Sequence, residues 1–388
     1  MNTMNKMGKA KSQRGFTLIE LMIAALIGVI VMASMTSVFR QAMNAMFTVT
    51  QRVETQQNMR AAVELMSKDI SMAGAGLPTG GLQLPTASAI LVACNQSDTC
   101  YVPGDTYPNS GGGSINYMYG ILPGFSNGVQ NGTVITNAPG VVNDSITSIY
   151  CDYNFSLSNF TFTFPSSTQA NVAVVSAAVT PNNILAPGGL NVGDLLLFIV
   201  STPGLGTASG SQGTSIAQTA AAVGEITGLP NNTTIDFASG DALNFNQPGA
   251  NSLASVAAAP AGTTTTVCRL YAVTYFLQVP AAGATVQVPR LMRQVNGLNA
   301  VPVADNIINL QFSYDVINTQ AGTITANASN PIAAGLSPAL IQKVNLWVIG
   351  EGLITGGTTS QSMYLASSVS TRNMSFCDSY SSQTTACQ

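Results

Sequence analysis

Residues Gly15-Phe16-Thr17-Leu18-Ile19-Glu20-Leu21-Met22-Ile23-Ala24 open the stretch that decides the fold, and the chain stays almost wholly apolar as far as Phe39. As a helix, the 24 residues from Phe16 to Phe39 would span about 36 Å, enough to cross a hydrocarbon core roughly 30 Å thick. The basic residues before this segment are Lys6, Lys9, Lys11 and Arg14. No further basic residue follows until Arg40, so the positive-inside rule predicts a cytoplasmic N-terminus and a body on the far side of the membrane.

An ordinary secretory signal peptide also has a basic end and an apolar centre, and it is cleaved after that centre. Here the apolar run is longer than a usual signal core and contains a carboxylate, Glu20. Burying that charge at membrane depth costs on the order of 2.5–3.5 kcal/mol or more unless it is paired. Cleavage between Gly15 and Phe16 would create a partner, the α-amine of Phe16 on a neighbouring subunit staggered along a filament. Glu20 is therefore predicted to set the register of assembly.

The string from Gly15 to Glu20 closely resembles the type IV prepilin motif. In that family a membrane aspartyl peptidase cuts after Gly and methylates the new N-terminal Phe. The resemblance implies prepilin peptidase cleavage at Gly15-Phe16, N-methylation of Phe16 and a role for Glu20 in subunit assembly. It also implies four parts: a leader peptide that is removed (1–15), the transmembrane half of a helix (16–39), its amphipathic periplasmic half (40–74) and a β-rich, disulfide-containing globular body (75–388).

The helical pattern continues beyond the membrane segment. Apolar residues recur mostly every three or four positions, which predicts one apolar stripe on a continuing helix; they are Val38, Ala42, Ala45, Val49, Val53, Met59, Val63, Met66 and Ile70. Gly74, Gly76 and Pro78 predict the end of this helix. The predicted fold class is α+β and pilin-like, with a long N-terminal helix, its first half transmembrane, packed on an antiparallel β-rich globular domain.

Beyond Pro78 the sequence is typical of β structure. Short runs rich in β-branched and aromatic residues alternate with Gly, Pro and Asn clusters. The predicted strands are 146–153, 160–164, 195–200, 270–279, 307–316 and 344–349. Residues 203–223, rich in Gly, Ser, Thr and Ala, are predicted to form a loop or a junction between two subdomains.

Six cysteines lie beyond the membrane segment: Cys94, Cys100, Cys151, Cys268, Cys377 and Cys387. An even number in an oxidising compartment predicts three disulfides, and six cysteines allow fifteen pairings. The close pairs Cys94/Cys100 and Cys377/Cys387 would close short loops and leave Cys151 with Cys268. Thiolate metal sites are the weaker alternative, because no Cys-x-x-Cys spacing occurs.

The composition argues against catalysis and against nucleic-acid binding. Only 7% of residues are charged, and neither Lys nor Arg occurs between Lys68 and Arg269, so the body lacks the basic surface that nucleic acids require. His is absent, and with it the commonest acid-base catalyst and metal ligand. No nucleophile elbow, zinc motif, phosphate loop or EF-hand occurs, and Asp144 and Asp152 flank one strand at too great a separation for a paired-carboxylate site. The chain is predicted to be no enzyme and to hold no cofactor or metal.

Several strings further resemble the PilW-type minor pilins, namely residues 59–70 with Ala73-Gly74, then 193–197, 307–314 and 370–374. Major pilins carry a proline inside the membrane helix, where this chain has Ser37, and they are usually much shorter. The resemblance implies a minor pilin that joins the priming or tip complex, starts filament assembly and supports adhesion and twitching motility.

Two alternatives stay open: a minor pseudopilin of type II secretion resembling GspJ, and a filament-displayed adhesin. For the adhesin the candidate contact residues are Tyr107, Tyr117, Tyr119 and Phe125, which lie among glycines and are expected to be exposed. The implied partners are other minor and major pilins, the prepilin peptidase, the inner-membrane assembly platform and a tip adhesin. The implied location is the bacterial inner membrane, as a single-pass protein, and then the periplasm and the pilus on the cell surface.

Overall fold

A computed structural model describes residues 15–78, 80–85, 90, 117–125, 143–202, 217–260, 263–278, 289–318, 323–331, 334, 336–352 and 361–374. Its helices are α1 (Leu18–Met72) and α2 (Leu253–Ala257), with short 3-10 turns at Leu157–Asn159 and Pro338–Leu340. The chain consists of two compact units, the first containing α1 up to Val53 and the second containing α1 from Glu54 onward with the β-sheets.

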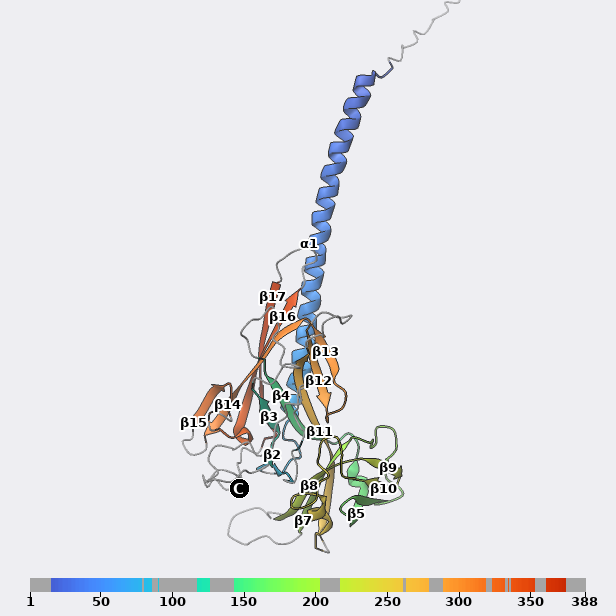
Figure 1. Ribbon diagram of the computed structural model, residues 1–388, viewed down its shortest axis with the longest axis vertical. Helices are drawn as coiled ribbons and strands as arrows, with labels where there is room; N and C mark the ends of the chain where they lie inside the picture. The colour runs from blue at the N-terminus through green and yellow to red at the C-terminus, as the bar shows by residue number, and fades with distance from the viewer. Residues whose placement is uncertain are drawn as a thin grey trace, which may run out of the picture. The chain divides into compact units, whose positions relative to one another are not determined.

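The described strands form four sheets, and every pairing described is antiparallel (Figure 1). The largest sheet contains β3 (Ile121–Gly124), β4 (Ser145–Asp152), β7 (Leu195–Thr202), β8 (Ala217–Glu225), β11 (Thr264–Gln278), β12 (Arg290–Val295) and β13 (Val301–Asp305). A four-stranded sheet has the order β15 (Thr323–Ala328), β14 (Ile307–Asn318), β16 (Ile341–Gly352), β17 (Gln361–Ser370). A second has the order β5 (Phe160–Ser166), β6 (Gln169–Val174), β10 (Thr234–Asp236), β9 (Gly228–Asn231), and β1 (Leu82–Gln83) pairs with β2 (Tyr117–Met118). The predicted α+β, pilin-like fold is confirmed.

The C-terminal part of α1 lies in the main hydrophobic core. Its buried apolar side chains follow the predicted stripe and pack with β4, β11, β14 and β16; they are Met59, Ala62, Val63, Met66 and Ile70. Gly350 on β16 lets the helix approach closely, since a Cβ there would lie 2.6 Å from the sulfur of Met59 and 2.9 Å from a methyl of Thr55. A side chain at position 350 would therefore displace the helix.

The predicted end of the helix is confirmed at Met72, and the residues that follow join the largest sheet. Gly74 adopts a φ of +85°, in the left-handed region that favours glycine. Its N–H donates to the carbonyl of Ile149 at 2.8 Å, and the N–H of Cys151 donates to the carbonyl of Ala75 at 2.8 Å. The backbone that ends α1 is thus bonded directly to β4.

Between β4 and β11 the chain makes a long insertion with a core of its own. The apolar run of β7 is buried on both faces, because Leu195 and Leu197 pack into one core while Leu196, Phe198 and Val200 pack into another with β5, β6 and α2. The two-sided burial explains why this strand reads as a continuous apolar run instead of an alternating one.

The six predicted strands all exist, although β11 and β16 begin earlier than predicted. The prediction of a loop over 203–223 is wrong from Ala217 onward, because β8 runs from Ala217 to Glu225 and pairs with β7, with Leu197 opposite Val223. The loop was predicted because this segment is rich in small residues, which are common in loops. Ala222 is fully buried against the insertion's core, where the close packing of the second sheet favours a small side chain.

Candidate assembly site

The apolar helix begins with a reciprocal pair of hydrogen bonds between Thr17 and Glu20. The backbone N–H and the hydroxyl of Thr17 both donate to Oε2 of Glu20 at 3.0 Å, and the N–H of Glu20 lies 3.4 Å from Oγ1 of Thr17. This is a capping box, and the N–H of Glu20 also donates to the backbone carbonyl of Thr17 at 3.1 Å. The Thr-x-x-Glu spacing in the sequence is typical of a capping box. Only an assembly role was nevertheless predicted for Glu20 from the sequence, and its capping role was missed.

Gly15, Phe16 and Thr17 precede the first helical residue, and the side chain of Phe16 is 87% exposed. The apolar side chains from Leu18 to Phe39 are exposed as well, and none of the most apolar window of α1 is buried within the protein. Of the residues that the structure describes, α1 is the one helix long and apolar enough to cross a membrane. A membrane or neighbouring helices must cover this surface in the cell, since its exposure to water is unfavourable.

A second polar site fixes the other end of α1 on the body. Asp69 is 3% exposed, and its carboxylate accepts hydrogen bonds from Tyr150 Oη at 2.8 Å, Tyr275 Oη at 2.6 Å and Arg293 Nε at 2.9 Å. The three donors come from β4, β11 and β12, which are neighbours in the largest sheet. One carboxylate on the helix is therefore bonded to three strands. The prediction missed this site, although an acidic residue three positions after Met66 falls on the apolar stripe and needs a partner there.

The electrostatics of this cluster follow from its burial. Removal from water, together with the charge of Asp69, raises the pKa of Tyr150 and of Tyr275 well above the usual value, so both phenols stay protonated as donors. Burial alone would lower the pKa of Arg293, but hydrogen bonds to Asp69 and its charge outweigh that effect and raise it. Arg293 consequently stays charged and both phenols stay protonated across the physiological range.

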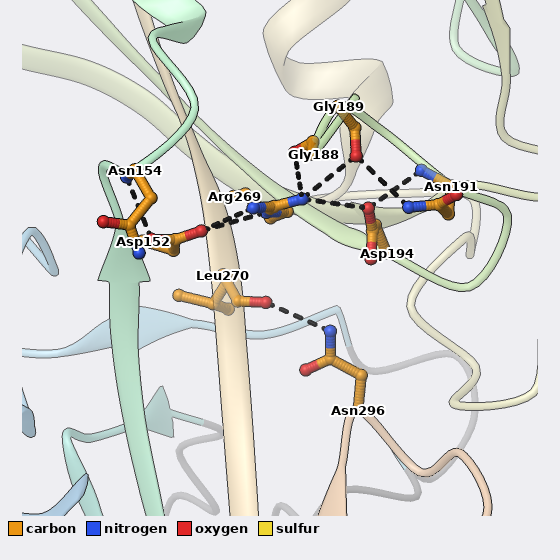
Figure 2. Close-up of polar contacts among 9 residues, drawn as sticks. All are labelled: Asp152, Asn154, Gly188, Gly189, Asn191, Asp194, Arg269, Leu270 and Asn296. Carbon is orange, nitrogen blue, oxygen red and sulfur yellow. Dashed lines mark hydrogen bonds and ion pairs between the residues drawn. The ribbon is translucent and has the colours of Figure 1, made fainter. Parts of the chain in front are cut away.

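Arg269 forms a comparable site at the base of the insertion (Figure 2). Its guanidinium donates to Oδ2 of Asp152 at 2.6 Å and 3.2 Å, and to the carbonyls of Gly188 and Gly189 at 3.2 Å and 3.1 Å. Asp194 lies 3.8 Å away. Burial would raise the pKa of Asp152, yet the hydrogen bonds and charge of Arg269 lower it, which keeps the carboxylate ionised.

Next to this ion pair, Cys151 of β4 and Cys268 of β11 form a disulfide in the structure, with Cα atoms 5.7 Å apart. The other predicted disulfide cysteines (Cys94, Cys100, Cys377 and Cys387) lie outside the described residues. The prediction of three disulfides therefore stays a prediction.

Most of the cations of the body are in ion pairs within the fold. Four basic side chains beyond α1 are in ion pairs: Arg269 with Asp152, Arg290 with Asp305, Arg293 with Asp69, and Lys343 with Asp315. Within the described ranges no group of three or more Cys, Asp or Glu side chains could hold a metal ion. Asp144 immediately precedes β4 and Asp152 is its last residue, so the two lie at opposite ends of the strand, as their spacing predicted.

The four candidate contact residues of an adhesin differ in their exposure. Tyr119 was expected to be exposed but is only 2% exposed. It packs with Met118 and Leu122 in the core that also contains Leu195 and Leu197. Phe125 is exposed, Tyr117 begins β2, and Tyr107 lies outside the described residues.

A capped apolar helix that carries one carboxylate near its start and continues into an antiparallel β body gives the chain a pilin-like α+β architecture. The family model described as the prokaryotic N-terminal methylation motif matches residues 10–36, which include Gly15, Phe16 and Glu20. No curated protein and no solved structure matches the chain. The motif supports a type IV pilin-like protein or pseudopilin, and it implies processing by a prepilin peptidase and assembly with other pilins. Together with α1 it fits anchoring in the inner membrane with a periplasmic body.

Proposed function

We propose that this chain is a PilW-like minor pilin of a type IV pilus. It joins other minor pilins in the priming or tip complex, starts filament polymerisation and so supports adhesion and twitching motility. The observation that carries the proposal is the methylation motif at residues 10–36, placed at the head of an apolar helix whose side chains the body leaves uncovered. A surface of this kind is suited to pack among the helices of other subunits.

Two features favour a minor subunit over a major one. The helix has Ser37 where major pilins carry a proline, and α1 runs without interruption from Leu18 to Met72. The body also contains a large insertion between β4 and β11. A subunit with so much additional mass is easier to accommodate at the end of a filament than at every position along it.

The proposed chemistry of assembly uses three residues. Cleavage between Gly15 and Phe16 frees the α-amine of Phe16, which is then methylated. In the membrane this cation pairs with Glu20 of an adjacent subunit, which offsets the cost of burying both charges. The capping box restricts the carboxylate, because the hydrogen bonds from Thr17 keep it beside the first turn of α1.

The test is deletion of the gene, followed by counts of surface pili and by twitching assays. The proposal expects loss of both, with restoration by the wild-type gene and normal secretion of enzymes across the outer membrane. If deletion leaves pili intact and abolishes enzyme secretion, the chain is a GspJ-like pseudopilin instead. Capture of the other minor pilins from solubilised membranes checks the priming-complex role, since a tip or priming subunit should bring them down in stable association.

A further inference from the structure

The outer face of the β15-β14-β16-β17 sheet contains a groove of about 870 Å³. Its floor comes from residues that alternate with buried ones, so Trp347 and Asn345 on β16 face outward while Leu346 and Val348 pack toward the helix. Trp347 lies opposite Gln311 on β14 in the strand register. The volume is in the range of sites for small molecules and short oligomers.

The lining combines exposed aromatic rings with uncharged polar groups. The indole of Trp347 is 51% exposed, and Phe125 is also exposed. Seven of the thirteen lining residues carry an amide or a hydroxyl, and such groups can both donate and accept hydrogen bonds. The described lining contains neither Lys nor Arg, and its one acidic residue, Asp144, is buried and accepts a hydrogen bond from the N–H of Phe312 at 3.0 Å.

The polar groups on the floor are held in place before any ligand arrives. The amide of Asn345 donates to Asp315 and to Asn327 Oδ1, both at 3.1 Å, and the N–H of Asn327 donates to Asp315 at 2.9 Å. Lys343 lies 2.7 Å from Asp315, so the one cation on this part of β16 is neutralised beside the groove. Fixed amides of this kind reduce the ordering cost of binding.

We propose that this groove binds a neutral saccharide, with the apolar face of one sugar ring packed on the indole of Trp347. A pyranose presents C–H groups on its faces and hydroxyls around its rim, so it matches an exposed aromatic ring bordered by amides and hydroxyls. The absence of Lys and Arg from the described lining disfavours nucleic acids and sulfated or sialylated sugars, which require cations.

A peptide is the less suitable occupant. Strand addition needs an open sheet edge, whereas β14 and β16 are both interior strands of their sheet and already paired on each side. An amphipathic helix would need a continuous apolar floor, and here polar side chains interrupt the apolar surface, since eight of the thirteen lining residues are polar.

The single Trp of the chain makes a direct test possible. Mature full-length protein is solubilised in a detergent without a sugar headgroup and titrated with maltotetraose, cellotetraose, chitotetraose and mannotetraose, with Trp emission as the readout. We expect at least one tetrasaccharide to shift the emission of Trp347 saturably and a sulfated tetrasaccharide to leave it unchanged. No response to any neutral sugar at 10 mM, or a response only to the sulfated one, overturns the proposal.

Substitutions in the groove test whether the saccharide binds there. By calorimetry, Trp347→Ala should abolish binding, and Asn345→Ala should weaken it at least tenfold. Tyr364→Ala is the matched control, because Tyr364 is 72% exposed on β17 of the same sheet but does not line the groove; it should bind as wild type does. Undiminished binding by both groove variants overturns the proposal. So does an emission change produced only by adding other pilin subunits, which would identify the groove as a subunit interface.

Discussion

Arg293 of β12 donates to both carboxylate oxygens of Asp69 on α1, with Nε 2.9 Å from Oδ2 and Nη2 3.4 Å from Oδ1. The pair joins the helix to the sheet at a depth where Asp69 is almost free of water. A charge in such a place is tolerated because its partner is fixed in position. The pair therefore fixes the position of the C-terminal part of α1 on the largest sheet.

Asp69→Asn should lower the free energy of unfolding of the body by about 3 kcal/mol, because it leaves Arg293 without its countercharge. Thermal or denaturant unfolding of the detergent-solubilised protein measures the change. Asp305→Asn is the control, since Asp305 pairs with Arg290 at a more exposed position and should cost less than about 1 kcal/mol. Equal losses in the two variants would contradict the special role of Asp69.

Glu20→Gln separates the two roles assigned to Glu20. Glutamine can still accept hydrogen bonds from Thr17 and preserve the capping box, but it carries no charge for the amine of a neighbouring subunit. We expect Glu20→Gln and Glu20→Ala to be cleaved and membrane-held yet to recruit other pilins poorly, and Glu20→Lys to recruit them worst. Thr17→Ala, which removes the hydroxyl and the γ-methyl but leaves the backbone N–H that donates to Glu20, should assemble nearly normally. If Glu20→Gln recruits partners as wild type does while Glu20→Ala does not, capping and not charge is what assembly requires.

The mature protein should begin at methylated Phe16. Mass spectrometry of the N-terminal peptide measures both the cut and the added methyl group. Replacing Gly15 with a bulky residue should leave residues 1–15 attached, with the body still folded. A wild-type protein that retains the leader, or one cut beyond Ala33, would refute the prepilin interpretation.

Replacing both Cys151 and Cys268 with Ser should destabilise the body by about 2–5 kcal/mol, because the bond closes a loop whose ends are 117 residues apart. Unfolding curves with and without reductant measure the cost, and the double variant should no longer respond to reduction of this bond. Non-reducing peptide mapping tests the three proposed disulfides. Free thiols at four or more of the six cysteines would exclude them.

Glu225→Gln should gain stability relative to wild type as the pH rises from 4 to 7. Burial, and then the nearby charge of Asp241, raise the pKa of Glu225. A raised pKa means that the stability linked to this group is complete below the ordinary Glu value, about 4.3, and is lost as pH rises through the folded value. Glutamine keeps an acceptor for the N–H of Leu243, which bonds Glu225 at 2.9 Å, without having to ionise. A stability difference that does not change with pH would contradict this assignment.

Local patterns were enough to predict the helix, its end and six strands. The stripe from Met59 to Ile70 predicted the buried face of α1, because the period of a helix places those residues on one side. The run 195–200 predicted a strand, but its burial on two faces could not be foreseen, since that depends on the insertion folding over it. The burial of Tyr119 could not be foreseen for the same reason, because segments distant in sequence cover it.

The functional residues also fall into two groups, those that could be predicted from the sequence and those that could not. The residues at 15–20 are contiguous and could be recognised together, whereas Asp69, Tyr150, Tyr275 and Arg293 are spread over more than two hundred positions. Only the fold of the largest sheet brings those donors to one carboxylate. The groove around Trp347 was equally hidden, because its lining comes from the four strands of one sheet together with Phe125 and Asp144, which lie far from them in sequence.

The junction of β4 and β11 has a mechanical consequence. The insertion begins after Asp152 of β4 and ends where β11 begins, and although its strands β7 and β8 extend the largest sheet, seven residue pairs and a disulfide join β4 directly to β11. A pulling force transmitted along the backbone through β4 would cross to β11 at this junction and bypass the insertion. The insertion would then carry no tension in a stretched filament, and its surface could diverge in sequence without weakening the subunit under load.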